Sequence, residues 1–312
     1  LSHIQAHTGI ASAQAFKDEY INVFHSPVMQ GKLSEKAWAI TYGKIAGTVL
    51  QQMENVGVNL SKVLEINAGV HSNADAVKQV DLSRLRPGER QGLTEGMGIF
   101  ILTQEEREAL RLPPEEQDVV KPTYKNSDIT PYLIDPEISL FMLYVDNDFD
   151  PQRYPTVMRH LTHFKPILKS RLERYGETYP WYRLHRPHQR RHYDAEKLVA
   201  PRWGKRIEFA YEGGGRYENS DINLFIKRKR TEENIKYFLA LLNAMPLKFW
   251  REHKGQFKGV SRQALLKSMP IRRIRFDPPP DEATKQTMLN GLKTSLDADD
   301  VHIGYALLHR SL

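Results

Sequence analysis

The stretch from Tyr179 to Tyr217 carries the side chains that proteins use to contact nucleic acids. Arginine and histidine alternate there with tryptophan and tyrosine, and acidic residues are few. Arginine and lysine neutralise phosphates, the arginine fork reads guanine edges, and flat rings stack on bases or wedge between them. The alternative is an ordinary cationic surface, whose aromatic rings belong to the core and make cation–π contacts.

Within this stretch we expect arginine and histidine side chains to face DNA. The expected set is Arg183, His185, Arg186, His188, Arg190, Arg191 and Arg202. A second group consists of Lys125 and Asn126, on an earlier polar loop, and Arg216, beside a glycine-rich turn.

A proline in the middle of the first set predicts a restrained backbone there, because Pro187 fixes its own φ angle. Restraint suits base reading, since a base-reading fork must be held in position. We therefore expect Arg186 and Arg190 to read base edges. Lys227 and Lys229 are expected to contact the phosphates of any sequence alike.

The totals favour a globular chain with an anionic partner. The 312 residues carry a formal net charge of +7, with 40% hydrophobic and 27% charged residues and a sequence pI near 9.3. Such a composition is typical of soluble globular proteins, and a basic balance favours nucleic acid. The absence of cysteine excludes disulfides and thiolate chemistry and fits the cytosol. Because the chain begins at Leu1 rather than Met, we expect it to be a piece of a longer polypeptide.

Motifs for catalysis are absent from the sequence. It contains no G-x-S-x-G elbow, no Walker loop and no H-E-x-x-H, and Asp277-Pro278-Pro279-Pro280 lacks the aromatic residue of an amino-methyltransferase tetrad. His185, His188 and His192 could form a metal set, but neighbouring arginines would repel a cation. We therefore expect neither catalytic nor metal-binding residues in this chain.

Short helices and strands are expected to alternate along the first half of the chain. The pattern predicts a helix over 34–56 ended by Gly57, a strand and turn from Leu60, and a strand over 99–103. Thr103 is expected to cap a short helix over 104–111. Residues 119–129 are interpreted as a loop that presents polar side chains, followed by a buried strand over 138–146.

The second half is expected to begin with one helix from residue 155 to 172, with Arg171 on its solvated face. A glycine turn at 213–215 predicts a hairpin between residues 207–211 and 222–226. Later predictions are a helix over 235–250 capped by Thr231, a strand over 270–276 and two helices over 281–312. We expect Trp181, Trp203, Phe249 and Trp250 in the core, and Asn243 to pack or cap a helix. Irregular alternation of this kind favours an α+β fold.

The order of these elements resembles the TaqI-like C-terminal specificity domain, which is the target-recognition domain of N6-adenine DNA methyltransferases and type IIG restriction–modification enzymes. The matching segments are Trp38-Ala39-Ile40, 69–77, 98–102, 120–122, 127–129, Tyr154-Pro155 with its helix, 181–187, 197–201, 239–244 and Met269-Pro270-Ile271. The match covers roughly residues 38–276. His71 and Ser72 depart from the family's first loop, and Asn126-Ser127 replaces its Gly-Arg pair.

The resemblance implies a helical linker over 1–60, a target-recognition domain over 61–276 and a C-terminal helical tail over 277–312. It also implies double-stranded DNA as partner, within a bacterial, cytoplasmic restriction or phage-defence system. An upstream methyltransferase domain of the same polypeptide would bind S-adenosylmethionine and transfer the methyl group. In some relatives the polypeptide also carries a nuclease. This fragment would then hold no cofactor of its own.

Two other classes of function stay open at this point. One is an RNA-binding or nucleoprotein module, which should expose stacking aromatic rings on a sheet. The other is a nuclease or other enzyme whose site is assembled from scattered acids and histidines.

Overall fold

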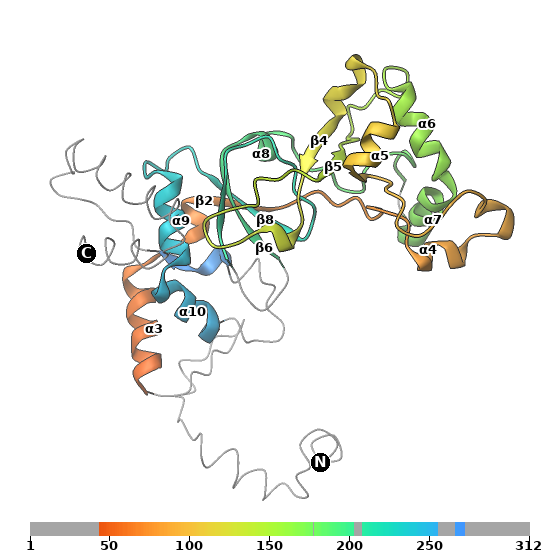
Figure 1. Ribbon diagram of the computed structural model, residues 1–312. Helices are drawn as coiled ribbons and strands as arrows, with labels where there is room; N and C mark the ends of the chain where they lie inside the picture. The colour runs from red at the N-terminus through yellow and green to blue at the C-terminus, as the bar shows by residue number, and fades with distance from the viewer. Residues whose placement is uncertain (1–43, 177, 203–207, 255–265, 272–312) are drawn as a thin grey trace, which may run out of the picture. The chain divides into compact units, whose positions relative to one another are not determined.

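The computed structural model describes residues 44–176, 178–202, 208–254 and 266–271 (Figure 1). The described residues belong to two compact units, one running to Ser61 and resuming at Met245, the other spanning Lys62–Ala244. The predicted tail over 277–312, the first part of the predicted helix over 34–56, and Trp203 lie outside the described residues. None of the described helices is both long and apolar enough to cross a membrane.

The smaller unit contains helix α3 (Lys44–Val56), helix α10 (Met245–Lys254) and an antiparallel pair of strands, β1 (Val58–Asn59) and β9 (Pro270–Ile271). The predicted end of α3 is confirmed, because the amide of Gly57 donates to the carbonyl of Met53 at 3.0 Å. Trp250 is 2% exposed, and its indole N–H donates to Glu54 Oε1 at 3.2 Å. Its predicted core position is therefore confirmed.

A four-stranded antiparallel sheet forms half of the larger unit. Its strands are β2 (Leu64–Ala68), β6 (Lys197–Pro201), β7 (Ala210–Glu212) and β8 (Ile222–Lys227), in the order β2-β8-β6-β7. The predicted hairpin between 207–211 and 222–226 is wrong, because β6 lies between β7 and β8. Every residue of β6 is buried, so a central position removes its backbone from water.

A second, three-stranded antiparallel sheet has the order β3-β5-β4, from β3 (Ile101–Thr103), β4 (Val120–Thr123) and β5 (Leu140–Leu143). The predicted polar loop over 119–129 is therefore wrong at 120–123. Pro122 is tolerated in β4 because β4 is an edge strand of this sheet. The buried strand expected over 138–146 covers only Leu140–Leu143, and Ile138, which precedes it, is 41% exposed.

Two predicted long helices are broken at prolines. Helices α6 (Pro155–His163) and α7 (Lys165–Tyr175) replace the single helix from residue 155. Helices α9 (Ile235–Asn243) and α10 replace the helix over 235–250. Pro166 and Pro246 each lack the N–H that would continue the helical hydrogen bonds.

Two N-terminal capping residues were predicted among the described residues, and one prediction was correct. Helix α5 (Gln104–Ala109) is capped by Thr103 as expected, because Thr103 Oγ1 accepts from the amide of Glu106 at 3.2 Å. Helix α9 is capped by Asn234 rather than Thr231, whose hydroxyl instead donates to the carbonyl of Val63 at 2.8 Å. The other described helices are α4 (Gln79–Arg84), α8 (Arg191–Asp194) and 3-10 turns at Leu60–Lys62, Pro87–Glu89, Pro114–Val119 and Asn126–Asp128.

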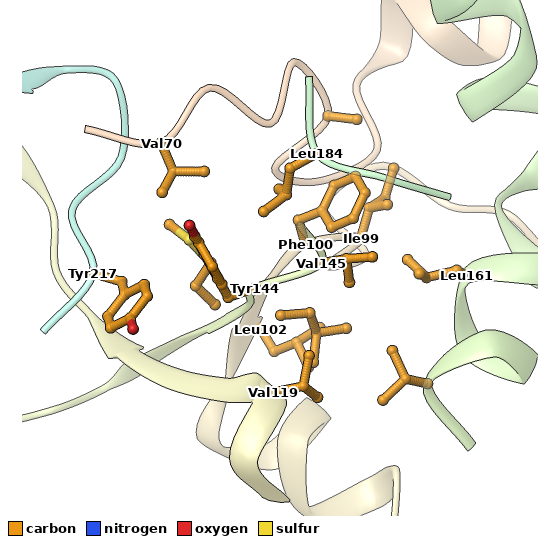
Figure 2. Packing of buried hydrophobic residues seen from close by; sticks show 14 of the residues in the cluster. Val70, Ile99, Phe100, Leu102, Val119, Tyr144, Val145, Leu161, Leu184 and Tyr217 are labelled. Atoms are coloured by element: carbon orange, nitrogen blue, oxygen red, sulfur yellow. The ribbon is translucent and has the colours of Figure 1, made fainter. Parts of the chain in front are cut away.

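A continuous apolar core joins the two sheets of the larger unit, which confirms the α+β prediction (Figure 2). It contains Leu102 beside β5, Leu161 from α6, and Val199 and Leu224 from the four-stranded sheet. Trp181 packs against this core with part of its surface exposed. Asn243 packs as predicted, since its amide exchanges two hydrogen bonds with the backbone of Phe209, at 3.0 and 2.8 Å.

A buried group of charges lies beside this core. Lys197 is 0% exposed; its ammonium bonds to the carboxylate of Glu212 and lies 3.4 Å from Glu218, which is also 0% exposed. The hydroxyl of Tyr124 donates to Glu218 at 2.9 Å. Burial raises the pKa of the Glu218 carboxyl to about 7 despite the lysine. This network ties β6 and β7 to the segment that precedes β8 and to the end of β4.

The raised pKa of Glu218 makes stability depend on pH. From pH 4.5 to about 7, the folded state holds a proton on Glu218 that the unfolded state releases. The free energy of unfolding from this group is therefore greatest below pH 4.5 and falls as the pH rises through 7, by on the order of 1 kcal/mol per pH unit. We expect Glu218→Gln to remove this slope. Urea unfolding from pH 4.5 to 8 measures it, with Glu196→Gln, an exposed carboxylate, as the control. A difference between wild type and Glu218→Gln that stays constant over this range would contradict the assignment.

Gly69 lies where two segments of the larger unit approach closely. A Cβ on Gly69 would stand 2.1 Å from the carbonyl oxygen of Asn219 and 2.4 Å from that of Glu218, whereas nothing lies within 4 Å of a Cβ on Gly88. Gly69→Ala should therefore lower the free energy of unfolding by about 1–3 kcal/mol. Gly88→Ala should leave it unchanged or raise it by up to about 1 kcal/mol. Urea unfolding of both variants tests this, and equal stabilities would contradict it.

Candidate nucleic-acid interface

The segment predicted to face DNA is paired at one point with the loop that follows β2. The amide of His71 donates to the carbonyl of Arg186 at 3.0 Å, and the amide of Arg186 donates to the carbonyl of His71 at 2.9 Å. Residues that exchange both hydrogen bonds in an antiparallel bridge project their side chains to the same face. His71 and Arg186 therefore share one face of this bridge.

The next residue, Pro187, is buried, and hydrogen bonds hold its backbone carbonyl. The hydroxyls of Tyr144 and Tyr193 both donate to its carbonyl, each at 3.0 Å. On the N-terminal side, the amide of Leu184 donates to the carbonyl of Val145 at 3.0 Å. The segment is thus restrained, as Pro187 predicted. The two side chains that flank the proline, Arg186 and His188, are exposed.

Arg171 on α7 holds the same region from the core. Its guanidinium donates to the carbonyls of Ser72, Trp181 and Arg183, and its side chain is 1% exposed. The expectation that Arg171 lies on a solvated face is wrong. Because five N–H donors point in fixed directions from one plane, a single arginine can hold separate backbone segments together.

Three of the predicted arginines are engaged by neighbouring side chains. Arg190 pairs with the buried carboxylate of Asp146 at 2.7 Å, and that hydrogen bond raises the pKa of its guanidinium. Arg183 donates to the side-chain oxygen of Asn147 and lies over the ring of Tyr179. Arg191 donates to Gln189 at 2.6 Å and lies 3.5 Å from Glu65. Each of these guanidinium groups is therefore oriented by the protein.

Arg186 and His188 differ from those arginines. Within the part of the chain that the structure describes, neither side chain makes a hydrogen bond or an ion pair. His188 adopts a left-handed backbone conformation, with a φ of 59°, and its ring meets that of His71 edge-on with centroids 5.9 Å apart. Both side chains are therefore open to a ligand on a backbone that is fixed.

The surroundings lower the pKa values of three imidazoles in this region. Burial, followed by the charges of His188, Arg202, Arg186 and His185, lowers the pKa of His71 to about 4. Burial also lowers the pKa of His188, with His192 and Arg186 adding to the effect. Burial and the charge of Arg191 also lower the pKa of His192, and Glu65 partly offsets this lowering. The positive charge of this region is therefore carried by its arginines rather than by these imidazoles.

We call this region the basic face. It consists of His71, His185, Arg186, His188, Arg191 and Arg202, which are exposed or partly exposed. Arg202 follows β6 and donates to the carbonyl of Ser220 at 3.3 Å. No group of three or more His, Asp or Glu side chains suited to a metal ion occurs among the described residues.

The second group of predicted residues lies by another loop. Arg216 donates to the carbonyls of Asp135 and Pro136, at 3.1 and 3.5 Å, and its guanidinium lies over the ring of Tyr124. Lys125 is exposed beside Tyr124, and Asn126 begins a 3-10 turn that also contains Asp128. Several acids surround these residues, so this loop is less suited to an anionic ligand than the basic face.

One member of the basic face, His71, and the buried residue that holds its backbone in place, Arg171, were not among the predicted site residues. His71 could have been noticed as a histidine in the family's first loop, although its partner Arg186 is far away in the sequence. Arg171 gave no signal, because its partners are backbone carbonyls, which any sequence provides.

Solved structures of two restriction–modification enzymes are similar to this chain. One is the type IIL enzyme MmeI in complex with DNA, at 12% identity and a TM-score of 0.45, covering 79% of this chain and 30% of that one. Another is the type IIG restriction endonuclease BpuSI, at 11% identity and a TM-score of 0.43, covering 80% of this chain and 28% of that one. The chain thus spans less than a third of either enzyme. No protein-family model and no curated protein matches the sequence.

Removing the Arg171 guanidinium should loosen the segment that carries the basic face. Arg171→Met keeps the bulk of the side chain but leaves buried carbonyls without a donor, each costing about 1–3 kcal/mol. We expect a lower melting temperature and faster tryptic cleavage after Arg183 and Arg190, neither of which precedes a proline. Arg159→Met, on the exposed side of α6, is the control and should leave both unchanged. Tryptic cleavage at the wild-type rate in Arg171→Met would show that other contacts hold the segment.

Proposed function

We propose that this chain is the domain that recognises double-stranded DNA in an adenine-N6 DNA methyltransferase or a fused restriction–modification enzyme of phage defence. One observation carries the proposal: Arg186 and His188 are exposed and unpaired, while Pro187 between them is held by two tyrosine hydroxyls. Reading a base edge requires a donor that is both free and held in position. The basic face provides both conditions together with the positive charge that attracts phosphates.

Base reading and phosphate binding fall to different residues in this proposal. Arg186 reads base edges, because its guanidinium has no partner among the described residues and its backbone is paired with that of His71. Arg190 has a committed partner in Asp146, so its role is to orient the segment. Lys227 at the end of β8 and Lys229 after it are exposed, and they contact phosphates of any sequence.

The chemistry of methyl transfer belongs to another domain in this proposal. The resemblance implies that S-adenosylmethionine binds in an upstream methyltransferase domain of the same polypeptide, and that the target adenine leaves the duplex to reach it. The purified chain should accordingly bind duplex DNA without methylating or cutting it. Methyl transfer by this chain alone would contradict the division of labour.

Two sets of substitutions distinguish base reading from phosphate binding. A preferred duplex is first selected from a randomised pool, and binding is then titrated on preferred and scrambled duplexes at two salt concentrations. Arg186→Ala should reduce the preference by about 1–3 kcal/mol while non-specific binding changes less. The double substitution Lys227→Ala, Lys229→Ala should weaken both duplexes alike and reduce the salt slope by about 2, one counterion for each lost contact.

Several results would overturn the proposal. If no duplex binds, or if a single-stranded RNA binds more tightly than any duplex, the chain is not a duplex reader. If Arg186→Ala and the double lysine variant behave identically on both duplexes, the basic face is only a cationic surface.

A further inference from the structure

His71 occupies a position on the basic face that a DNA-contacting residue would need. It lies three residues beyond β2, opposite Arg186 in the antiparallel bridge, with its ring edge-on to His188 at 5.9 Å. It is partly buried, and its ring makes no hydrogen bond among the described residues. A ligand that reaches Arg186 and His188 would therefore also meet His71.

The largest electrostatic effects on the His71 ring come from arginine and histidine side chains. From the segment around Pro187 these are His185, Arg186 and His188, and from the residues after β6 the group is Arg202. The acid on the same loop, Asp75, is largely buried and accepts a hydrogen bond from the Ser72 hydroxyl. The largest electrostatic effects on this imidazole therefore all come from basic side chains.

This arrangement keeps His71 uncharged in the free protein at neutral pH, since its pKa is about 4. The pKa of His188 is lowered as well. A phosphate placed on the basic face would reverse the local potential, because an opposite charge within about 4–6 Å favours the charged form of an ionisable group. Each imidazole that meets a phosphate would then take a proton from the solvent and gain a second N–H donor.

We propose that His71 and His188 contact the DNA backbone directly and take up protons as DNA binds, so that affinity for duplex DNA rises as the pH falls. This inference rests on the proposed function and adds to it a residue, His71, and a coupling between binding and protonation. The sign follows from linkage: binding raises the proton affinity of the imidazoles, so protons in turn favour binding.

The experiment titrates duplex binding at fixed ionic strength between pH 5.5 and 8, using fluorescence anisotropy of a labelled 30-base-pair duplex of scrambled sequence. A scrambled sequence suffices because phosphate contacts are independent of sequence. Wild-type affinity should rise toward low pH, by at most about tenfold per pH unit for each imidazole that takes up a proton. Calorimetry in two buffers with different ionisation enthalpies should show net proton uptake.

Variants assign the effect to particular residues. His71→Gln and His188→Asn each remove one ionisable ring, and asparagine suits the left-handed backbone at position 188. Each variant should flatten the pH slope and reduce proton uptake, with the larger loss of affinity below pH 6.5. His163→Gln, an exposed ring on α6, is the matched control and should keep the wild-type slope.

The outcomes distinguish this inference from the function on which it rests. If duplex DNA binds but both variants keep the wild-type slope and proton uptake, the inference is wrong and the proposed function stands. If no duplex binds across the pH range, the proposed function itself fails. Thermal melting of each variant shows whether it is folded, and if His71→Gln is not, the His188→Asn slope decides.

Discussion

A buried guanidinium fixes the position of two loops on the larger unit. Arg171 donates to the carbonyl of Ser72 and to that of Arg183, two residues that lie far apart in the sequence. Its charge is further balanced by the faces of Phe100 and Tyr179, at 5.6 and 5.7 Å. Burying a charge is costly unless hydrogen bonds and neighbouring groups compensate it. The loop after β2 and the segment around Pro187 can therefore meet only where this side chain has placed them.

The arginines of the central stretch do different work although the sequence presents them alike. Arginines that bond to acids or amides, such as Arg190 with Asp146, are held in one orientation and keep the segment in place. The guanidinium of Arg186 stays free, because it makes no hydrogen bond or ion pair among the described residues. Composition alone indicates a basic region, but the partners decide which cations can meet a ligand. Asp146 and Asn147, which engage Arg190 and Arg183, follow β5, far from the stretch in sequence. Glu65, which lies near Arg191, belongs to β2.

Local signals in the sequence predicted local structure well. The Thr103 cap depends on a glutamate three residues later, and the end of α3 depends on Gly57, so both follow from short-range chemistry. Pairings between distant segments could not be predicted in the same way. The position of β6 between β7 and β8 depends on burial from both sides, and the bridge between His71 and Arg186 joins two loops. The polar loop was misread at Pro122 because an edge strand accepts proline.

The pairing of β2 with β8 has a consequence for how the chain is made. Strand β2 leaves the ribosome early, but its only described sheet partner, β8, follows after the whole of the three-stranded sheet and helices α5 to α8. At about 5–20 residues per second, the delay is on the order of ten to thirty seconds. Leu64 and Ile66, both buried in the finished fold, stay exposed during this time. The intervening segment can complete its own local contacts first, so β2 stays open to chaperones or to misassociation while the chain is being made.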